Sequence, residues 1–261
     1  MDAARTLLSG IVDYAGLFPP ASATMEQAVA EYARQRESGG SWMLAAFVVP
    51  VARLGEFADA ADGPLAASQG PWPLSVLVGA DYREELDALA KWVRDQEPGR
   101  VGVAALEHRP ATPEAVADVA SRAAGVELFL ELPWDADLRP WVEAVRAAGA
   151  RAKIRCGGVT PDLIPPVDRV AEFLRVCSDA GVGLKFTAGL HHPVRGEYPL
   201  TYEPDAPRAM MHGFLNVFVG SALVGAEDCS DLTLLAVLEL SLIHISEPTR
   251  RACRSRMPSY A

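Results

Sequence analysis

Short apolar runs alternate with amphipathic segments along most of the chain. The expected strands cover 10–17, 42–49, 74–78, 100–106, 126–132, 151–156 and 183–187. The expected helices cover 25–37, 51–61, 82–96, a segment that begins at 112–114, 138–148, 167–180 and 207–223. Apolar positions three and four residues apart predict helices, whereas short apolar runs bounded by Pro or Gly predict buried strands. Regular alternation of the two predicts βαβ units around a parallel sheet.

Seven strand-then-helix units in a chain of this length predict one α/β domain over residues 1–239. The expected architecture is a (β/α)8 TIM-type barrel, which typically needs about 250 residues. An open doubly wound sheet is the alternative. It is less favoured because neither a GxGxxG nor a Walker A pattern follows any expected strand.

The last segment of the chain differs from the rest. Residues 240–261 hold four arginines and one acidic residue, and LSLIHISEPTR resembles the translated adapter of a sequencing library. We expect a non-native, disordered tail there, with the barrel truncated at its C-terminus and its eighth strand missing. His244 and Cys253 then have no functional role. A natural basic tail is the alternative.

Composition narrows the class of protein. Half of the 261 residues are hydrophobic, 22% are charged and the net charge is −10, which excludes a wholly disordered chain and disfavours a nucleic-acid binder. The four cysteines form no CxxC pair, which indicates reduced thiols. No signal peptide is apparent, and the longest apolar run, 214–226, is too short to cross a membrane. We expect a cytoplasmic protein with a small-molecule partner and neither nucleic-acid nor membrane partners; a homo-oligomer is possible.

Charged residues lie inside three consecutive expected strands. Side chains alternate along a strand, so Glu131, Lys153 and Arg155 occupy the face opposite the wholly aliphatic one, and so do Lys185 and Thr187. The aliphatic face of a barrel strand packs on helices, so these five side chains are expected to point inward near one end. Buried charges are costly unless paired, and barrel active sites lie at the carboxyl ends of the strands. The alternative is a set of structural ion pairs.

Two lysines in one space favour amine chemistry. A lysine crowded by a second cation has a lowered pKa, and its neutral amine attacks carbonyl groups to form a Schiff base. The segments AKIRCGG (152–158), VGLKFTAGL (182–190) and VELFLELPW (126–134) resemble strands of the deoxyribose-phosphate aldolases, a class I aldolase family. This resemblance implies that Lys153 is the Schiff-base residue, that Lys185 tunes its pKa, and that no cofactor or metal is needed.

The chain also departs from that family. Arg155 stands where the family has a small hydroxyl residue, and the loop GLHHPVRGEYP is unlike its phosphate-binding loop. Longer stretches, DYAGLFPP, WMLAAFVVP, KFTAGLHHP and MHGFLNVF, resemble a bacterial (β/α)8-barrel family to which no activity is attached. The resemblances together imply a barrel fold and leave the substrate open.

The expected activity is a class I aldolase-like carbon–carbon lyase acting on a small anionic carbonyl compound. Lys153, Lys185 and Glu131 are the expected catalytic residues. The expected substrate-binding residues are Arg155, Thr187, His191, His192 and Asp13. A metal-dependent hydrolase or isomerase that uses Glu131, Asp13 and the two histidines is one alternative, and a non-catalytic barrel that binds an anionic metabolite is another.

Several other polar residues have two interpretations. Arg195 either binds an anion or is a solvated loop charge, and Asp13 either transfers protons or caps a turn. His212 and Asn216 share a helix face in the expected 207–223 helix, where a hydrogen-bonded core role is favoured. One residue of the Glu107–His108 pair is expected to face inward.

Overall fold

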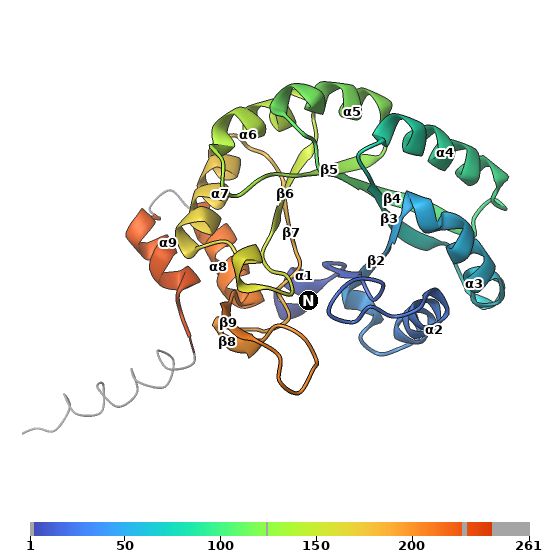
Figure 1. Ribbon diagram of the computed structural model, residues 1–261, viewed down its shortest axis with the longest axis horizontal. Helices are drawn as coiled ribbons and strands as arrows, with labels where there is room; N and C mark the ends of the chain where they lie inside the picture. The colour runs from blue at the N-terminus through green and yellow to red at the C-terminus, as the bar shows by residue number, and fades with distance from the viewer. Residues whose placement is uncertain (1–2, 124, 226–228, 242–261) are drawn as a thin grey trace, which may run out of the picture. The chain divides into compact units, whose positions relative to one another are not determined.

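The computed structural model describes residues 3–123, 125–225 and 229–241 (Figure 1). It has a mixed α/β fold whose residues divide into two compact units. The first unit comprises 1–132, 140–153 and 182–184, and the second comprises 133–139, 154–181 and 185–261. The expectation of a single domain over 1–239 stays a prediction.

Strands and helices alternate as expected. The helices are α1 (Ala3–Leu8), α2 (Met25–Arg36), α3 (Leu54–Ala67), α4 (Tyr82–Asp95), α5 (Val116–Arg122), α6 (Leu138–Ala147), α7 (Val167–Asp179), α8 (Phe214–Val224) and α9 (Asp231–Leu238). The strands are β1 (Val12–Tyr14), β2 (Leu44–Pro50), β3 (Trp72–Val78), β4 (Val101–His108), β5 (Glu127–Glu131), β6 (Arg151–Arg155), β7 (Leu184–Thr187), β8 (Gly196–Pro199) and β9 (Arg208–Met211).

Strands β1 to β7 form one sheet in chain order, and β8 and β9 form a separate hairpin. Each strand from β1 to β6 pairs in parallel with the next one of that series. Backbone hydrogen bonds join β6 to the chain around β7 within each unit, from Ala152 to Gly183 in the first and from Cys156 to Thr187 in the second. The seven strands predicted from the apolar runs are therefore present and parallel.

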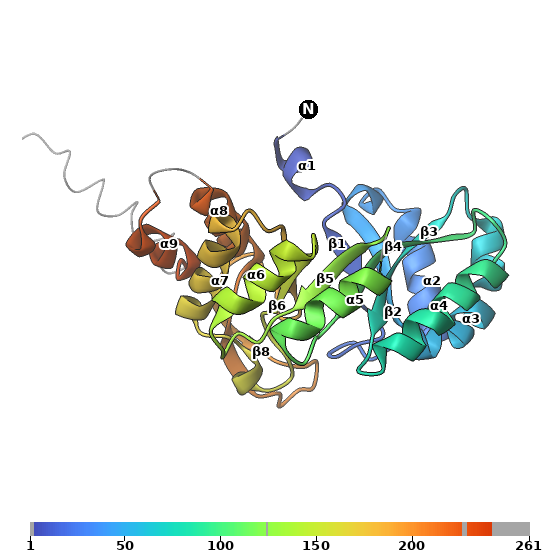
Figure 2. The ribbon, with the colours of Figure 1, turned by 90° about the horizontal axis from the view of Figure 1, so that it is seen from above.

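Helices and an aromatic cluster pack against the strands of the first unit (Figure 1). In Figure 1, helices α3, α4 and α5 lie along one side of the strands, and Figure 2 shows α4 and α5 beside β3 to β5 from above. A cluster of buried rings from α2, β2, α3 and β3 forms part of the core of this unit. Tyr32 lies edge-on to Phe47 and to Trp72, with ring centroids 5.3 and 4.9 Å apart, and Phe57 packs on Phe47 at 5.2 Å.

Helix α2 begins at the residue that the sequence predicts. The Thr24 hydroxyl accepts a hydrogen bond from the Gln27 amide, and the Gln27 side chain accepts one from the Thr24 amide. This reciprocal capping satisfies two backbone donors that a helix start otherwise leaves without partners. It fixes the first turn of the helix that carries Tyr32 into the aromatic cluster.

The segment 207–223 in the second unit differs from the prediction of one helix. Residues 208–211 form β9, which pairs antiparallel with β8 so that Gly196 lies opposite Met211. The helix begins only at Phe214, after Gly213 in an extended conformation. The apolar residues 209–211 satisfy a strand face as well as a helix face, so a short run cannot distinguish the two. Strand β9 and α8 thus add a further strand-then-helix step before residue 240.

Two glycines bring the ends of β6 and β7 close together in the second unit. A Cβ on Gly157 would lie 2.5 Å from the Gly189 Cα, and one on Gly189 would lie 2.6 Å from the Cys156 carbonyl oxygen. Gly189 also has a φ of 71°, which disfavours residues with a side chain. Both positions therefore require glycine.

Helices of the described residues are too short or too polar to cross a membrane. The predicted non-native tail covers 240–261. Its residues 242–261, with His244 and Cys253, lie outside the described residues.

Candidate functional site

A buried cluster of charged side chains lies on β4, β5 and β6 of the first unit. The Lys153 Nζ atom is 2.7 Å from Glu107 Oε2 and 2.9 Å from Glu131 Oε2. The three side chains are 3–10% exposed. One ammonium group therefore lies between two carboxylates in the protein interior.

Strand pairing explains how these three residues meet. Lys153 lies directly opposite Glu131 in the β5–β6 register, so their side chains leave the sheet on the same face. Glu107 lies opposite Phe129, and Phe129 lies opposite Arg151. The long lysine side chain therefore passes Phe129 to reach a carboxylate two strands away.

A serine on β3 completes the cluster. Ser75 is fully buried, and its hydroxyl donates a hydrogen bond of 2.6 Å to Glu107 Oε1. Each oxygen of Glu107 thus has a donor, Ser75 for one and Lys153 for the other. Buried carboxylates are tolerated only when hydrogen-bonded or paired, and both conditions hold for Glu107.

The cluster confirms part of the sequence prediction and extends it. Glu131 and Lys153 share one face of adjacent strands, as the alternation predicted. Glu107 is the inward member of its pair: His108 instead approaches the Val78 carbonyl at 3.1 Å and packs on Tyr82. Ser75 was missed. The only signal for it was a single hydroxyl residue in the apolar strand WPLSVLV.

Other predicted site residues belong to the second unit. Arg155, Lys185 and Thr187 are half-buried on β6 and β7. His191 is exposed in the loop after β7, whereas the His192 ring stacks on Tyr198 with centroids 3.4 Å apart. Their predicted roles in substrate binding, and that of Lys185 in tuning Lys153, stay predictions.

Asp13 has a structural contact in the first unit. Its Oδ1 atom accepts a hydrogen bond of 3.1 Å from the Ala46 amide and so ties the β1 segment to β2. This bond joins two neighbouring strands and tests neither the turn cap nor the proton transfer expected for Asp13. A role for Asp13 in substrate binding stays a prediction.

No group of three or more His, Cys, Asp or Glu side chains within 3–123, 125–225 and 229–241 is arranged to hold a metal ion. The Glu131 carboxylate, which the metal-dependent alternative needs as a ligand, is bonded instead to the Lys153 ammonium. The alternative therefore gains no support from the contacts of Glu131.

Two cysteines are packed thiols. Cys156 and Cys177 are fully buried, and burial raises the pKa of each thiol to about 12. A thiol with so high a pKa supplies almost no thiolate at neutral pH. Cys156, which directly follows β6, is therefore a packed structural thiol and a poor candidate for a nucleophile.

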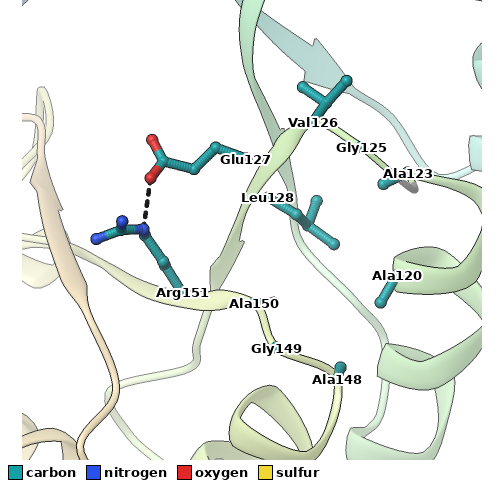
Figure 3. A pocket seen from close by; sticks show the side chains of 10 residues that line it. All are labelled: Ala120, Ala123, Gly125, Val126, Glu127, Leu128, Ala148, Gly149, Ala150 and Arg151. Carbon is teal, nitrogen blue, oxygen red and sulfur yellow. Dashed lines mark ion pairs between the residues drawn. The ribbon is translucent and has the colours of Figure 1, made fainter.

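A pocket of about 360 Å³ lies at the amino ends of β5 and β6 (Figure 3). Small apolar side chains and backbone form most of its wall. Glu127 and Arg151 line it as well, but they point toward each other on the other side of the strands from Leu128, where their side chains are 2.5 Å apart. No set of polar groups converges in this pocket. The group of Lys153, Glu107, Glu131 and Ser75, which we call the Lys153 cluster, is therefore the stronger candidate for chemistry.

Comparisons with protein-family models, with curated proteins and with solved structures found no match to this chain.

Proposed function

We propose that the protein is a lyase of the class I aldolase type, which uses Lys153 to form a Schiff base with a small anionic carbonyl compound. The observation that supports this proposal is the buried Lys153 amine, hydrogen-bonded to the carboxylates of Glu107 and Glu131. A catalytic base must lie within hydrogen-bond reach of the proton that it takes, and both carboxylates meet that condition.

The proposed first step conserves charge inside the cluster. Glu131 takes a proton from the Lys153 ammonium, and the neutral amine adds to the substrate carbonyl to give a carbinolamine. Glu131 then returns a proton to the carbinolamine hydroxyl, which leaves as water. In balance, the ammonium and the carbonyl compound yield a protonated imine and one water molecule. The positive charge stays on the lysine nitrogen, so the carboxylates that stabilise the ammonium also stabilise the iminium.

Carbon–carbon cleavage follows from the same groups. The iminium accepts the electron pair of the breaking bond and becomes an enamine, while a carboxylate removes the proton from the substrate hydroxyl. The released fragment is an aldehyde or ketone. The same carboxylate protonates the enamine carbon, and water then hydrolyses the resulting imine to free the second product and restore Lys153. In this scheme Glu107, held by Ser75, is the fixed counterion and Glu131 the proton carrier.

We further propose that the fold is of the (β/α)8 class. The support is topological: the parallel strands follow one another in chain order, which is the connectivity of a barrel rather than of a doubly wound sheet. Barrel active sites use residues at the carboxyl ends of several strands. Glu131 is the last residue of β5, and Glu107 is the last but one of β4.

Reductive trapping tests the lysine assignment. The chain has only three lysines, Lys91, Lys153 and Lys185, so an adduct is easily mapped. The protein is incubated with pyruvate, glyoxylate or acetaldehyde and sodium cyanoborohydride, then digested and analysed by mass spectrometry. We expect an adduct on Lys153 with an anionic carbonyl compound, well above the labelling of the exposed Lys91 in the same sample.

Two variants complete the test. Lys153→Met should remove the adduct, and Lys91→Met should leave it unchanged. Labelling of Lys153 no greater than that of Lys91 overturns the proposal. An adduct confined to Lys185 overturns the assignment of Lys153 as the nucleophile.

A further inference from the structure

A second group of buried polar atoms lies at the open end of the β8–β9 hairpin, in the second unit. Gly196 on β8 lies opposite Met211 on β9, so Arg195 and His212, each one residue beyond that pair, adjoin each other. We call these two residues the Arg195–His212 cluster. Neither residue takes part in the chemistry proposed for Lys153.

The hydrogen bond of His212 fixes its tautomer. His212 is 2% exposed, and its Nε2 atom is 2.7 Å from the Pro165 carbonyl oxygen. A carbonyl oxygen can only accept, so Nε2 carries the proton. Burial lowers the pKa of His212 by more than the hydrogen bond to Pro165 raises it, and the positive charge of Arg195 lowers it as well, which favours the neutral ring. Nδ1 is therefore a hydrogen-bond acceptor.

This acceptor and a neighbouring donor are both left without protein partners. His212 Nδ1 and Arg195 Nε are buried, and neither has a hydrogen-bond partner in the described part of the chain. Buried polar atoms are almost always hydrogen-bonded, so two of them on adjoining residues require an explanation. Arg195 offers N–H donors and a permanent positive charge, whereas His212 offers a lone pair.

The backbone around the cluster is held rigidly. The Arg195 amide donates to Asn216 Oδ1 at 2.9 Å, and Asn216 Nδ2 donates to the carbonyls of Val237 and Leu240 at 2.8 Å each. Gly213 passes so close that a Cβ on it would lie 2.5 Å from the Arg195 nitrogen. The backbone that carries Arg195 is therefore fixed by hydrogen bonds, and the Pro165 carbonyl orients the His212 ring, which lowers the entropic cost of binding.

We propose that the Arg195–His212 cluster binds a small oxyanion that also carries a hydroxyl group, such as a 2-hydroxycarboxylate. The anionic oxygen accepts from the Arg195 guanidinium, and the ligand hydroxyl donates to His212 Nδ1. A simple carboxylate satisfies only Arg195. Hydrogen phosphate has the same combination of anionic oxygen and hydroxyl donor, so the test must distinguish it from a hydroxy acid.

The test compares glycolate with acetate, which differ in the hydroxyl group alone. The full chain, with ¹⁵N-labelled histidine, is titrated with each anion while the Nδ1 resonance of His212 is followed by NMR. We expect glycolate to shift this resonance and to bind about tenfold more tightly than acetate, the usual effect of one added hydrogen bond. Equal affinities, or no shift at His212, overturn the proposal.

Arginine variants locate the anion. Arg195→Gln should weaken glycolate binding at least tenfold, because it removes the positive charge but leaves the buried His212 in place. The matched control is Arg208→Gln on β9, an exposed arginine whose side chain donates to the Glu197 carbonyl. Equal loss in both variants overturns the assignment to Arg195.

A final arm distinguishes the ligand class. Inorganic phosphate is titrated into the same sample, alone and in competition with glycolate. Phosphate that displaces glycolate from the native protein but has no effect on Arg195→Gln supports the shared recognition chemistry. Phosphate binding without glycolate binding overturns the hydroxycarboxylate assignment. A crystal structure in glycolate that shows only a water molecule between Arg195 and His212 overturns the site altogether.

Discussion

Strands β5 and β6 carry two ion pairs on the same face, and their surroundings differ sharply. Arg151 and Glu127, at the amino ends, are 2.5 Å apart with side chains 50% and 41% exposed. Lys153 and Glu131 are 2.9 Å apart with side chains 6% and 10% exposed. The sequence pattern treats the two pairs alike, since both join adjacent strands. Burial separates them: water screens the first pair, whereas the second exists only because each charge compensates another.

The largest expected difference in stability is between the variants that remove Lys153 and Arg151, the cations of the two pairs. Lys153→Met leaves two carboxylates buried without their shared ammonium, and we expect it to lower the free energy of unfolding by about 3–5 kcal/mol. Arg151→Met removes a solvated charge and should cost no more than about 1 kcal/mol. Urea unfolding of both variants at neutral pH, followed by circular dichroism, measures the difference. Equal costs would show that the Lys153 cluster is hydrated.

This expectation affects how catalytic experiments on Lys153 are interpreted. A residue that acts only as a nucleophile can be removed without harm to the fold. The contacts of Lys153 with Glu107 and Glu131 indicate otherwise for this residue. Loss of activity in a Lys153 variant supports the proposed chemistry only when the variant is shown to be folded. The comparison of Lys153 with Lys91 in the trapping experiment avoids this difficulty because it labels the native protein, whereas the result for Lys153→Met counts only when that variant is folded.

The glutamates of the two ion pairs, Glu131 and Glu127, give the second test. Glu131→Gln keeps the shape of the side chain but leaves Lys153 with Glu107 as its remaining carboxylate in the cluster. We expect a loss of about 1–3 kcal/mol in the free energy of unfolding, because a charge-assisted hydrogen bond is lost in the interior. Glu127→Gln should change stability by no more than about 0.5 kcal/mol.

The variants Glu131→Gln and Glu127→Gln also separate an effect on stability from an effect on chemistry. As the proposed proton carrier, Glu131 is needed for imine formation, and Glu127 is not. Glu131→Gln should therefore slow reductive labelling of Lys153 about a hundredfold, measured by mass spectrometry over time. Glu127→Gln should label at the native rate. Unchanged labelling in Glu131→Gln would assign the proton transfer to another group.

The sequence predicted the strands and the inward face better than it predicted the partners. Period-two alternation is local, so Glu131 and Lys153 could be placed on one face without any coordinates. The bond from Lys153 to Glu107 depends on the register of β4, β5 and β6 together, which alternation does not determine. Ser75 was missed for the same reason: a single serine in an apolar strand gives no sign that its hydroxyl bonds Glu107, which lies opposite Leu77.

The second unit shows another limit of sequence patterns. Residues 208–211 were expected to be helical because their apolar positions continue into α8, yet they pair with β8. His212 and Asn216 were therefore expected to share a helix face in a hydrogen-bonded core. Only Asn216 lies in the helix, where its amide bonds three backbone groups. His212 lies directly after β9, and its ring bonds the carbonyl of Pro165, 47 residues earlier in the chain, which no short-range pattern indicated.

The smallest expected effect is the coupling energy between the two residues of each ion pair. The response of this coupling energy to salt distinguishes the exposed pair from the buried one. A double-mutant cycle on Arg151 and Glu127, using the Met and Gln variants, should give a coupling energy of about 0.2–1 kcal/mol. Raising the ionic strength from about 0.05 M to 1 M shortens the screening length to about 3 Å, so this coupling should largely vanish. The corresponding cycle on Lys153 and Glu131 should keep most of its coupling, because ions cannot enter between buried charges. If both couplings fall equally with salt, solvent reaches Lys153, and water and ions weaken the attraction between the carboxylates and the proposed iminium.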